Sequence, residues 1–553
     1  MSTNASVLET KCLSSLAKVF ADEEIRDLSI KKATALRNEV YSFQIAFRGK
    51  KIFKGVQVKI VSALQEFVMI RTVGLVPSEM PCYPERDEKI LRSTPGLYPD
   101  PLYPLDPAEG VTVVPEQWRA IWLNVELNEK VKTGVYPIEV QLISSSGEQL
   151  GVEHLELEIL SALLPKQKLI HTEWFHTDCL STFYEVDVFS EEHWHRIDQF
   201  IHTAVKHGMN MILTPLFTPP LDTKVGGERP TVQLVGVEKK GGAYSFNFDL
   251  LLKWVNLCLS RGVEYFEFSH LFTQWGAQHA PKIIAKENGE LKKIFGWETA
   301  AAGDEYKNFL NSFLPELVKF IKKHDLQKRS YFHVSDEPNI KHLESYRNAC
   351  EIVRGHLKEF PMIDALSDYD FYEKGLVKNP IPANNHIQPF LDHQVPNLWT
   401  YYCCGQGKDV SNRFFNMASA RNRIIGFQLY KFDIVGFLHW GYNFYYAQHS
   451  VKPINPFQVT DAVFAFPSGD AFLVYPGANG PIESIRLEVF YEALQDLRAL
   501  QLLETFVGKK QVVEWLEAGL SKEITFNEYP LDAEWLLSKR DFINRKIAEY
   551  STR

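Results

Sequence analysis

The 553-residue sequence lacks the features that mark exported, membrane-inserted or disulfide-bonded proteins. Its first 27 residues contain no apolar segment of the signal-peptide type, because Lys11, Asp22 and Glu24 interrupt them. No apolar run approaches the length that spans a bilayer. Seven cysteines, an odd number scattered along the chain, are typical of free thiols in a reducing compartment. We therefore expect a cytoplasmic protein without membrane insertion.

An excess of positive charge is also missing. Lys and Arg number 60 against 69 Asp and Glu, which gives a formal net charge of −9. Proteins that bind nucleic acid present a basic patch to the phosphate backbone, so this balance predicts no nucleic-acid partner. The negative net charge is compatible with an acidic or a neutral sugar as the substrate. Nothing in the composition indicates the oligomeric state.

The motifs of several enzyme classes are missing too. There is no His-Glu-x-x-His for a catalytic zinc, no glycine-rich phosphate loop between a strand and a helix, and no Gly-x-Ser-x-Gly elbow for acyl transfer. Cys403-Cys404 has no second pair at zinc-ligand spacing, and we interpret both residues as buried structural thiols. We expect neither a metal nor another cofactor.

Two kinds of hydrophobic periodicity predict the fold class, which is multidomain β plus α/β. From about residue 28 to 160, apolar residues such as Phe43 and Ile45 alternate with polar ones, which predicts an N-terminal β-sandwich domain over residues 1–162. After this domain, short apolar strands alternate with helical segments, which predicts a (β/α)8 TIM-type barrel over residues 163–505. Residues 506–553 are predicted to form a helical extension packed on the barrel. The eight strand candidates of the barrel are Leu169–Trp174, Met211–Leu216, Tyr265–Phe272, Ser330–Asp336, Met362–Ser367, Asn397–Tyr402, Gly436–Trp440 and Ala471–Tyr475.

Asp336 and Glu337 stand at the end of the fourth candidate strand, with Pro338 directly behind them. An isolated Asp-Glu-Pro is more often a solvated turn or a helix N-cap. In a (β/α)8 barrel, however, the carboxyl ends of the strands form the active face. Proline ends the ladder and holds Glu337 in an extended or turn conformation, so both acids can point into one cleft. Two such acids resist simultaneous ionisation, which favours acid–base catalysis.

The other predicted strand ends carry aromatic and polar side chains. Pyranose rings present C–H faces that pack on aromatic rings, while sugar hydroxyls bond to acids, amides and imidazoles. Aromatic residues make up 13% of the chain, although each one alone is as compatible with core packing as with binding. We therefore predict a carbohydrate-binding rim. Its members are Trp174, His176, Asp178, His333, Asp368, Trp399, Tyr401, Tyr402, Trp440 and Asn443.

Motifs over nearly the whole chain resemble glycoside hydrolase family 123, the β-N-acetylgalactosaminidase-type enzymes. The resemblance implies a sandwich followed by a (β/α)8 barrel and retaining hydrolysis of a carbohydrate or glycoconjugate. It also implies an adjacent catalytic Asp-Glu pair, which falls on Asp336 and Glu337. The motifs are Asn38-Glu39-x-x-Ser42-Phe43-Gln44, His171-Thr172-Glu173-Trp174-Phe175-His176, His333-x-Ser335-Asp336-Glu337-Pro338, Leu398-Trp399-Thr400-Tyr401-Tyr402-Cys403-Cys404 and Gly436-Phe437-Leu438-His439-Trp440-Gly441-Tyr442-Asn443.

The resemblance and the chemistry together assign roles to the two acids. A 2-acetamido sugar can use its own carbonyl oxygen as the nucleophile, so Asp336 would hold the acetamido N–H and stabilise the oxazolinium, while Glu337 would protonate the leaving oxygen. Tyr401 or Tyr402 would orient the acetamido carbonyl, and Trp399 and Trp440 would form the floor or wall of the sugar pocket. The resulting expectation is an exo-glycosidase that removes terminal β-linked N-acetylgalactosamine.

Three alternatives stay open. The first is a β-N-acetylglucosaminidase or another glycosidase on the same barrel, because the two amino sugars differ only at the C4 hydroxyl. The second is a carbohydrate-binding protein without turnover, although such a protein has no need of a paired acid and base. The third is a metal-dependent barrel hydrolase, which would lose activity with a chelator.

Overall fold

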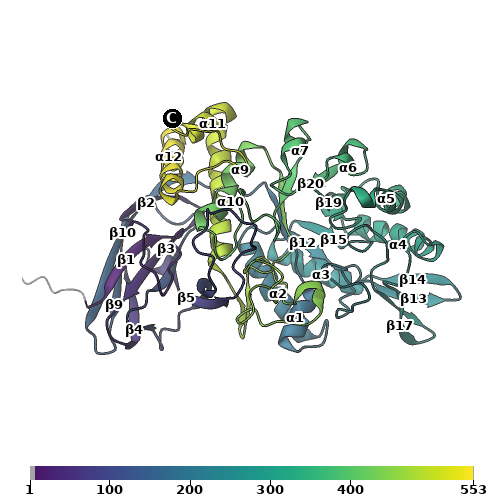
Figure 1. Cartoon of the computed structure of the whole chain (residues 1–553), viewed down its shortest axis with the longest axis horizontal. Helices are drawn as coiled ribbons and strands as arrows, with labels where there is room; N and C mark the ends of the chain where they lie inside the picture. Colours follow the sequence, from purple (N-terminus) through teal and green to yellow (C-terminus); the bar gives the residue numbers. More distant parts are fainter. Residues whose placement is uncertain (1–6, 552–553) are drawn as a thin grey trace, which may run out of the picture.

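The computed structural model describes residues 7–551, and its first part is a β-sandwich of two five-stranded sheets (Figure 1). Apart from the parallel pair β2–β10, neighbouring strands in both sheets run antiparallel. Phe43 and Ile45 are fully buried between the sheets, as their alternation with polar residues predicts. One sheet has the order β1 (Glu9–Ser14), β3 (Glu39–Arg48), β8 (Arg119–Leu127), β5 (Val68–Ser78) and β6 (Gly96–Pro104). The other has the order β2 (Lys32–Arg37), β10 (Gln149–Leu163), β9 (Gly134–Ile143), β4 (Phe53–Val61) and β7 (Val111–Val113).

The second part is a closed barrel of eight parallel strands. Six of them form one sheet in the order β18-β15-β12-β11-β22-β21, and β19 and β20 form a parallel pair. Parallel bridges from Phe332 to Met362 and from Ala383 to Tyr401 join that pair to β18 and β21, which closes the barrel. The predicted (β/α)8 architecture is therefore confirmed. The strands are β11 (Ile170–Glu173), β12 (Met211–Thr214), β15 (Tyr265–Phe268), β18 (Ser330–Phe332), β19 (Ile363–Ala365), β20 (Asn379–Ile381), β21 (Trp399–Tyr401) and β22 (Gly436–His439).

Seven of the eight predicted barrel strands are correct, and the eighth is wrong. In place of Ala471–Tyr475, the remaining strand of the barrel is β20, which contains Pro380 and precedes Pro382. Proline cannot donate to a ladder, so this short segment has the pattern of a loop. Tyr475 instead begins a small antiparallel pair, β23 (Tyr475–Gly477) and β24 (Gly480–Ile482).

The helices cover the barrel and join it to the sandwich. In α4 the acids Asp304 and Glu305 lie in the first turn and Lys322 and Lys323 in the last, which suits the helix dipole. Helices that follow the barrel strands or lie between them are α1 (Thr177–Tyr184), α2 (Glu191–Lys206), α3 (Asp249–Arg261), α4 (Asp304–Lys323), α5 (Leu343–Leu357), α6 (Asp370–Glu373), α7 (Gln388–Asp392), α8 (Ser419–Arg423), α9 (Ile425–Lys431) and α10 (Ile485–Val507). The C-terminal helices are α11 (Lys509–Glu517) and α12 (Ala533–Ser551).

Helix α10 lies between the sandwich and the barrel, and α12 lies against both α10 and the sandwich strands β2 and β10 (Figure 1). The interface is polar as well as apolar: Glu488 of α10 pairs with Arg71 of β5 and accepts from Asn124 of β8 at 2.9 Å. Such buried ion pairs define the relative orientation of the two parts, because an unpaired charge there is costly. The predicted domain boundaries stay predictions.

Two long loops enlarge the rim of the barrel. The segments after β12 and β15 contribute a separate four-stranded sheet, in the order β14-β13-β16-β17, at the far end of the molecule from the sandwich (Figure 1). Its strands are β13 (Gly236–Lys240), β14 (Ala243–Asn247), β16 (Ile283–Glu287) and β17 (Glu290–Phe295). Across residues 7–551, no helix combines the length and apolarity that a bilayer span requires.

Candidate active site

Asp336 and Glu337 follow β18 at the carboxyl end of the barrel, where the backbone is held from both sides. The amide of Trp275 donates to the carbonyl of Asp336 at 2.9 Å, and the amide of Glu337 donates to the carbonyl of Ala365 at 3.1 Å. Glu337 has φ +42°, in the left-handed region rather than the extended one. A non-glycine residue adopts this conformation at a cost that the surrounding contacts must offset. Both acids are half-buried.

A cavity of about 210 Å³ opens beside the two acids. The predicted residues Trp174, Tyr401 and Trp440 line it together with Asp336 and Glu337, so the barrel brings these five together. We call it the inner cavity. Its other lining residues are Leu221, Asp222, Gln274, Trp275, Ala365, Cys403, Cys404, Leu438, Gln448 and Phe466.

A second and wider cavity of about 640 Å³ adjoins the inner one, and we call it the outer cavity. Glu337 and Tyr401 line both cavities, whereas Asp336 lines the inner one. Asp368, a predicted binding residue, lines the outer cavity. Its remaining lining residues are Pro338, Asn339, Leu366, Ser367, Tyr369, Asn385, His386 and Pro389. Glu337 therefore stands at the junction of the two spaces.

The environment of the pair favours retention of a proton. Burial raises the pKa of Asp336 well above its usual range, and the neighbouring Glu337 raises it further. Burial also raises the pKa of Glu337, against a hydrogen bond from the hydroxyl of Tyr401, which donates to Oε1 at 2.7 Å. Two interacting carboxyls release their protons in two separate steps. The pair can thus supply one acid and one carboxylate at the same pH.

The sequence leaves Tyr401 and Tyr402 as alternatives for the residue that orients the acetamido carbonyl. Their side chains face opposite sides of the strand end. Tyr401 points to Glu337, whereas Tyr402 is fully buried and its ring lies 5.0 Å from that of Phe437. Trp399 is also buried and packs against Tyr331, and neither cavity includes it. Tyr402 and Trp399 are therefore packed in the interior and line neither cavity, and their contact with substrate stays a prediction.

His176, Asp178 and Asn443 form a buried network under the cavity wall instead of lining it. Arg229 binds Asp178 through two hydrogen bonds of 2.7 and 2.8 Å, and it lies 3.2 Å from Nδ1 of His176. Nε2 of His176 is 2.8 Å from the carbonyl of Trp440. Burial, together with the charge of Arg229, lowers the pKa of His176 to about 3. Of these predicted binding residues, His176 contacts Trp440, and none lines either cavity; their contact with substrate stays a prediction.

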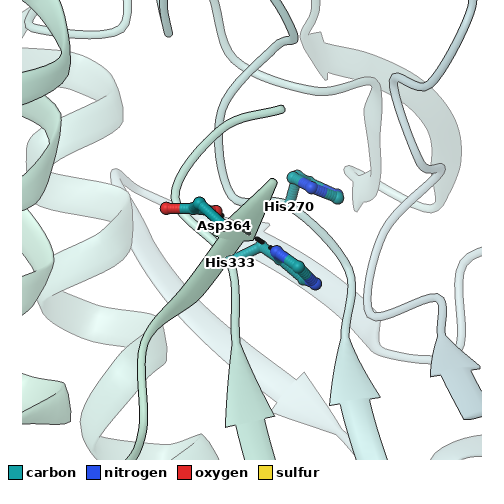
Figure 2. Close-up of side chains that lie close together, drawn as sticks. All are labelled: His270, His333 and Asp364. Atoms are coloured by element: carbon teal, nitrogen blue, oxygen red, sulfur yellow. Dashed lines mark hydrogen bonds and ion pairs between the residues drawn. The ribbon is translucent and has the colours of Figure 1, made fainter. Parts of the chain in front are cut away.

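His333, another predicted binding residue, is fully buried. It forms a cluster with His270 and Asp364 whose ligand atoms lie within 4.8 Å of one another, the usual composition of a metal site (Figure 2). However, both nitrogens of His333 already bond to carboxylates, and its ring is stacked on that of His270 at 4.2 Å and 19°. Two nearly parallel rings cannot both direct a nitrogen lone pair at one ion. The donor geometry favours an ion-pair cluster.

Several cavity residues were absent from the predicted set. Asp222, Gln274, Trp275 and Gln448 come from loops after the strands, where no periodicity marks a side chain as inward-facing. Asp222 accepts from the amide of His449 at 2.9 Å, and burial raises its pKa. The only sequence signal of these four loop residues is a position shortly after a barrel strand. Cys403 and Cys404, predicted to be buried, are free thiols half-exposed on the wall of the inner cavity. This prediction was wrong because the strand ends at Tyr401 and the chain turns along the rim.

Comparisons with known proteins concern the family and the fold of the chain. Residues 174–503 match the family described as Glycoside hydrolase 123, catalytic domain. A structure of a family 123 glycoside hydrolase from Clostridium perfringens, from work on glycolipid glycan hydrolysis, is similar over 99% of each chain, with a TM-score of 0.75 and 15% identity. A β-glucuronidase from Parabacteroides merdae has a TM-score of 0.31 and 10% identity, and covers 88% of this chain and 51% of its own. A family 5 mannosidase from Rhizomucor miehei has a TM-score of 0.32 and 12% identity, and covers 66% of this chain and 97% of its own.

The last two similarities are too weak to carry an argument, and a search of curated proteins gave no match. The family match, by contrast, covers more than half of the chain and includes every barrel strand after the first. The similar fold of the Clostridium perfringens enzyme extends over the sandwich as well. The chain belongs to glycoside hydrolase family 123, so it is a glycosidase and its substrate is a carbohydrate.

Proposed function

We propose that the protein is a retaining exo-glycosidase that removes terminal β-linked N-acetylgalactosamine with the help of the sugar's own 2-acetamido group. The observation that carries this proposal is the arrangement of the two consecutive acids. Asp336 faces the inner cavity, whereas Glu337 lines both the inner and the outer cavity. A terminal sugar in the inner cavity and its leaving group in the outer one would place the scissile bond beside Glu337.

The inner cavity suits a single sugar with an acetamido group. Trp174, Trp275 and Trp440 offer flat apolar faces to its C–H surfaces, and Leu438 and Ala365 close the base. The indole N–H of Trp440 donates to Asp470 at 2.8 Å, which fixes the ring. A closed base favours removal of terminal residues over cleavage within a chain.

In the first chemical step, the acetamido oxygen forms a bond to the anomeric carbon while the bond to the leaving oxygen breaks. Glu337 transfers its proton to that leaving oxygen. Asp336, as a carboxylate, accepts the acetamido N–H and stabilises the positive oxazolinium. In the second step water attacks the anomeric carbon, Glu337 takes up its proton, and the acetamido group is restored. Retention of configuration follows from the two inversions.

Neither acid has to be a nucleophile in this scheme. Retaining enzymes with an enzymic nucleophile place two carboxyls about 5 Å apart on opposite sides of the bond that breaks. Consecutive residues on one strand end approach the sugar from the same side, which suits stabiliser and acid better than nucleophile and acid. The hydroxyl of Tyr401 bonds to Glu337 in the free protein and is close enough to the inner cavity to orient the acetamido carbonyl.

A panel of nitrophenyl β-glycosides, assayed with and without EDTA, tests the proposal. We expect turnover of the N-acetylgalactosaminide, little turnover of the 2-hydroxy galactoside, and no effect of the chelator. Faster turnover of the N-acetylglucosaminide would change the assigned sugar and leave the mechanism intact. Efficient turnover of the 2-hydroxy substrate would contradict the mechanism, and turnover of no glycoside would favour a binding role.

A further inference from the structure

Phe466, from the long loop after β22, forms part of the wall of the inner cavity. Its ring packs edge-on against that of Trp440, with the ring centroids 5.2 Å apart and the planes at 70°. Phe466 is buried, and it ends the segment 461–466, which we call the rim turn. The position of this aromatic wall therefore depends on the backbone of the rim turn.

The backbone of the rim turn is strained. Three consecutive residues have left-handed φ values: +52° for Ala462, +65° for Val463 and +58° for Phe464. A residue with a Cβ atom adopts this conformation at a cost, and the β-branched Val463 is among the least suited to it. Such strain persists only where surrounding contacts hold it. Side-chain packing does not hold it at Phe464, which is 62% exposed.

Hydrogen bonds from Asp461 hold the rim turn from its first residue. Oδ1 of Asp461 accepts from the amides of Val463 and Phe464, both at 3.1 Å. The carbonyl of Asp461 accepts from the amides of Ala465 and Phe466, both at 3.0 Å. One residue thus binds four successive or neighbouring amides of the turn, and its side chain is itself buried.

The second carboxylate oxygen of Asp461 binds the sandwich. Oδ2 accepts from the amide of Met80 at 3.1 Å. Met80 belongs to the segment 78–83, the sandwich loop, which begins at the last residue of β5 on the side of the sandwich that faces the barrel (Figure 1). The carbonyl of Met80 accepts from the amide of Ser468 at 3.0 Å, and the hydroxyl of Ser78 donates to that of Ser468 at 2.7 Å. Both serines are buried, so this is an internal junction.

Tyr83, at the end of the sandwich loop, contacts two stretches of the cavity wall. Its hydroxyl donates to the carbonyl of Ala465 at 2.7 Å, directly before Phe466 in the chain. The same side chain interacts with the thiol of Cys404, which lines the inner cavity from the loop after β21. Tyr83 is not among the residues that line either cavity. Any effect on a bound sugar therefore passes through the wall residues.

We propose that the sandwich loop completes the active site: it holds the rim turn in its left-handed conformation and so preforms the wall of Phe466 and Trp440 for the terminal sugar. Tyr83 and Asp461 are positioning residues, which act through Phe466. A sugar that meets a preformed wall does not have to order it, and this favours affinity. The effect on the sugar rests on the proposed function, whereas the hold on the rim turn does not.

The first test follows the rim turn itself, by hydrogen–deuterium exchange of peptides over residues 460–468 in the full-length protein. Tyr83→Phe keeps the ring and removes one hydrogen bond, so exchange of this segment should become about 2- to 10-fold faster. The matched control is Tyr136→Phe, because Tyr136 is a sandwich residue whose hydroxyl also donates to a backbone carbonyl, that of Lys132 at 2.9 Å. Unchanged exchange in Tyr83→Phe, or an equal increase in Tyr136→Phe, would overturn the proposal.

The second test is the division between KM and kcat on nitrophenyl β-N-acetylgalactosaminide. A wall that contacts the sugar alike in the ground state and the transition state contributes uniform binding. Tyr83→Phe should therefore raise KM about 2- to 10-fold and leave kcat nearly unchanged. Partial unfolding would instead lower the amount of active enzyme, and so the apparent kcat, with KM in place. A KM equal to that of wild type would refute the effect on the sugar.

The third test asks whether Asp461 opposes backbone strain. Asparagine leaves one oxygen for the three amides that the carboxylate binds, so Asp461→Asn should raise KM more than Tyr83→Phe does. Adding Phe464→Gly should bring KM back toward the wild-type value, because glycine adopts positive φ freely. A double variant no better than Asp461→Asn would refute this role of Asp461. If Asp461→Asn does not fold, Tyr83→Phe still decides whether the sandwich loop acts on the site.

Failure of the proposed function is recognised separately. Absence of turnover with every 2-acetamido glycoside would refute that function, while the exchange of residues 460–468 would still decide whether the sandwich holds the rim turn. If the glycoside panel selects another sugar, the comparison of KM values applies to that substrate, with the same expected increase in Tyr83→Phe.

Discussion

Tyr401→Phe is the most informative single change, because it removes one hydroxyl and leaves the ring. That hydroxyl donates to Oε1 of Glu337 at 2.7 Å, and this bond lowers the pKa of Glu337. A hydrogen bond to a charged group contributes about 1.5–3 kcal/mol, and one pKa unit corresponds to about 1.4 kcal/mol. Loss of the bond should therefore raise the pKa of Glu337 by about one to two units.

The sign of the effect on activity follows from the role of Glu337. The bond stabilises the ionised form, so its removal extends the range in which Glu337 keeps its proton. Because the proton is needed for the leaving group, the basic limb of kcat/KM should move to higher pH by about one to two units. The apparent pKa values that set the two limbs belong to the pair of acids and not to single residues. The acidic limb should therefore be followed in the same experiment.

The assay is the pH dependence of kcat/KM on a nitrophenyl N-acetylgalactosaminide, for wild type, Tyr401→Phe and Tyr402→Phe. Tyr402 is the matched control, since its ring lies on the other side of the chain, beside Phe437 and Arg413. Tyr402→Phe should leave the basic limb in place. A basic limb that stays fixed in Tyr401→Phe, or moves to lower pH, would refute the assignment of Glu337 as the acid.

Four further predictions concern the same site and its support. Glu337→Gln should impair hydrolysis of substrates with poor leaving groups far more than that of nitrophenyl glycosides; equal losses in kcat would remove Glu337 from the acid role. Asp336→Asn should lower kcat by about 10²–10³-fold with little change in KM, and near-normal kcat would contradict its role at the oxazolinium. A thiazoline analogue of N-acetylgalactosamine should inhibit far more tightly than the free sugar, and a covalent sugar adduct on either acid, detected by mass spectrometry, would speak against substrate assistance. Arg413→Met should destabilise the fold by about 3–5 kcal/mol, because it leaves the buried carboxylate of Glu173 without the partner that binds it at 2.7 and 2.9 Å; a denaturation midpoint close to that of wild type would show that the pair is dispensable.

The fold class follows from the amino-acid pattern alone, because buried strands need apolar residues at regular spacing. Period-two alternation in the first 160 residues predicts the sandwich, and short apolar strands separated by helices predict the barrel. Segment β20 marks the limit of this reasoning. Pro380 and Pro382 give it the pattern of a loop, and it becomes a strand because β19 and the end of β21 offer it partners on both sides.

The sequence also determined that two acids stand together at the end of a buried strand, since adjacency is a property of the chain. The residues that surround the two acids depend on how the barrel folds. Tyr401 and Glu337 are 64 residues apart, and His333 meets Glu267 across 66 residues, so no local pattern distinguishes Tyr401 from Tyr402 or a buried histidine from one at the cavity wall. Contacts of this kind depend on which strands become neighbours when the barrel closes, and on which loops then cover its rim.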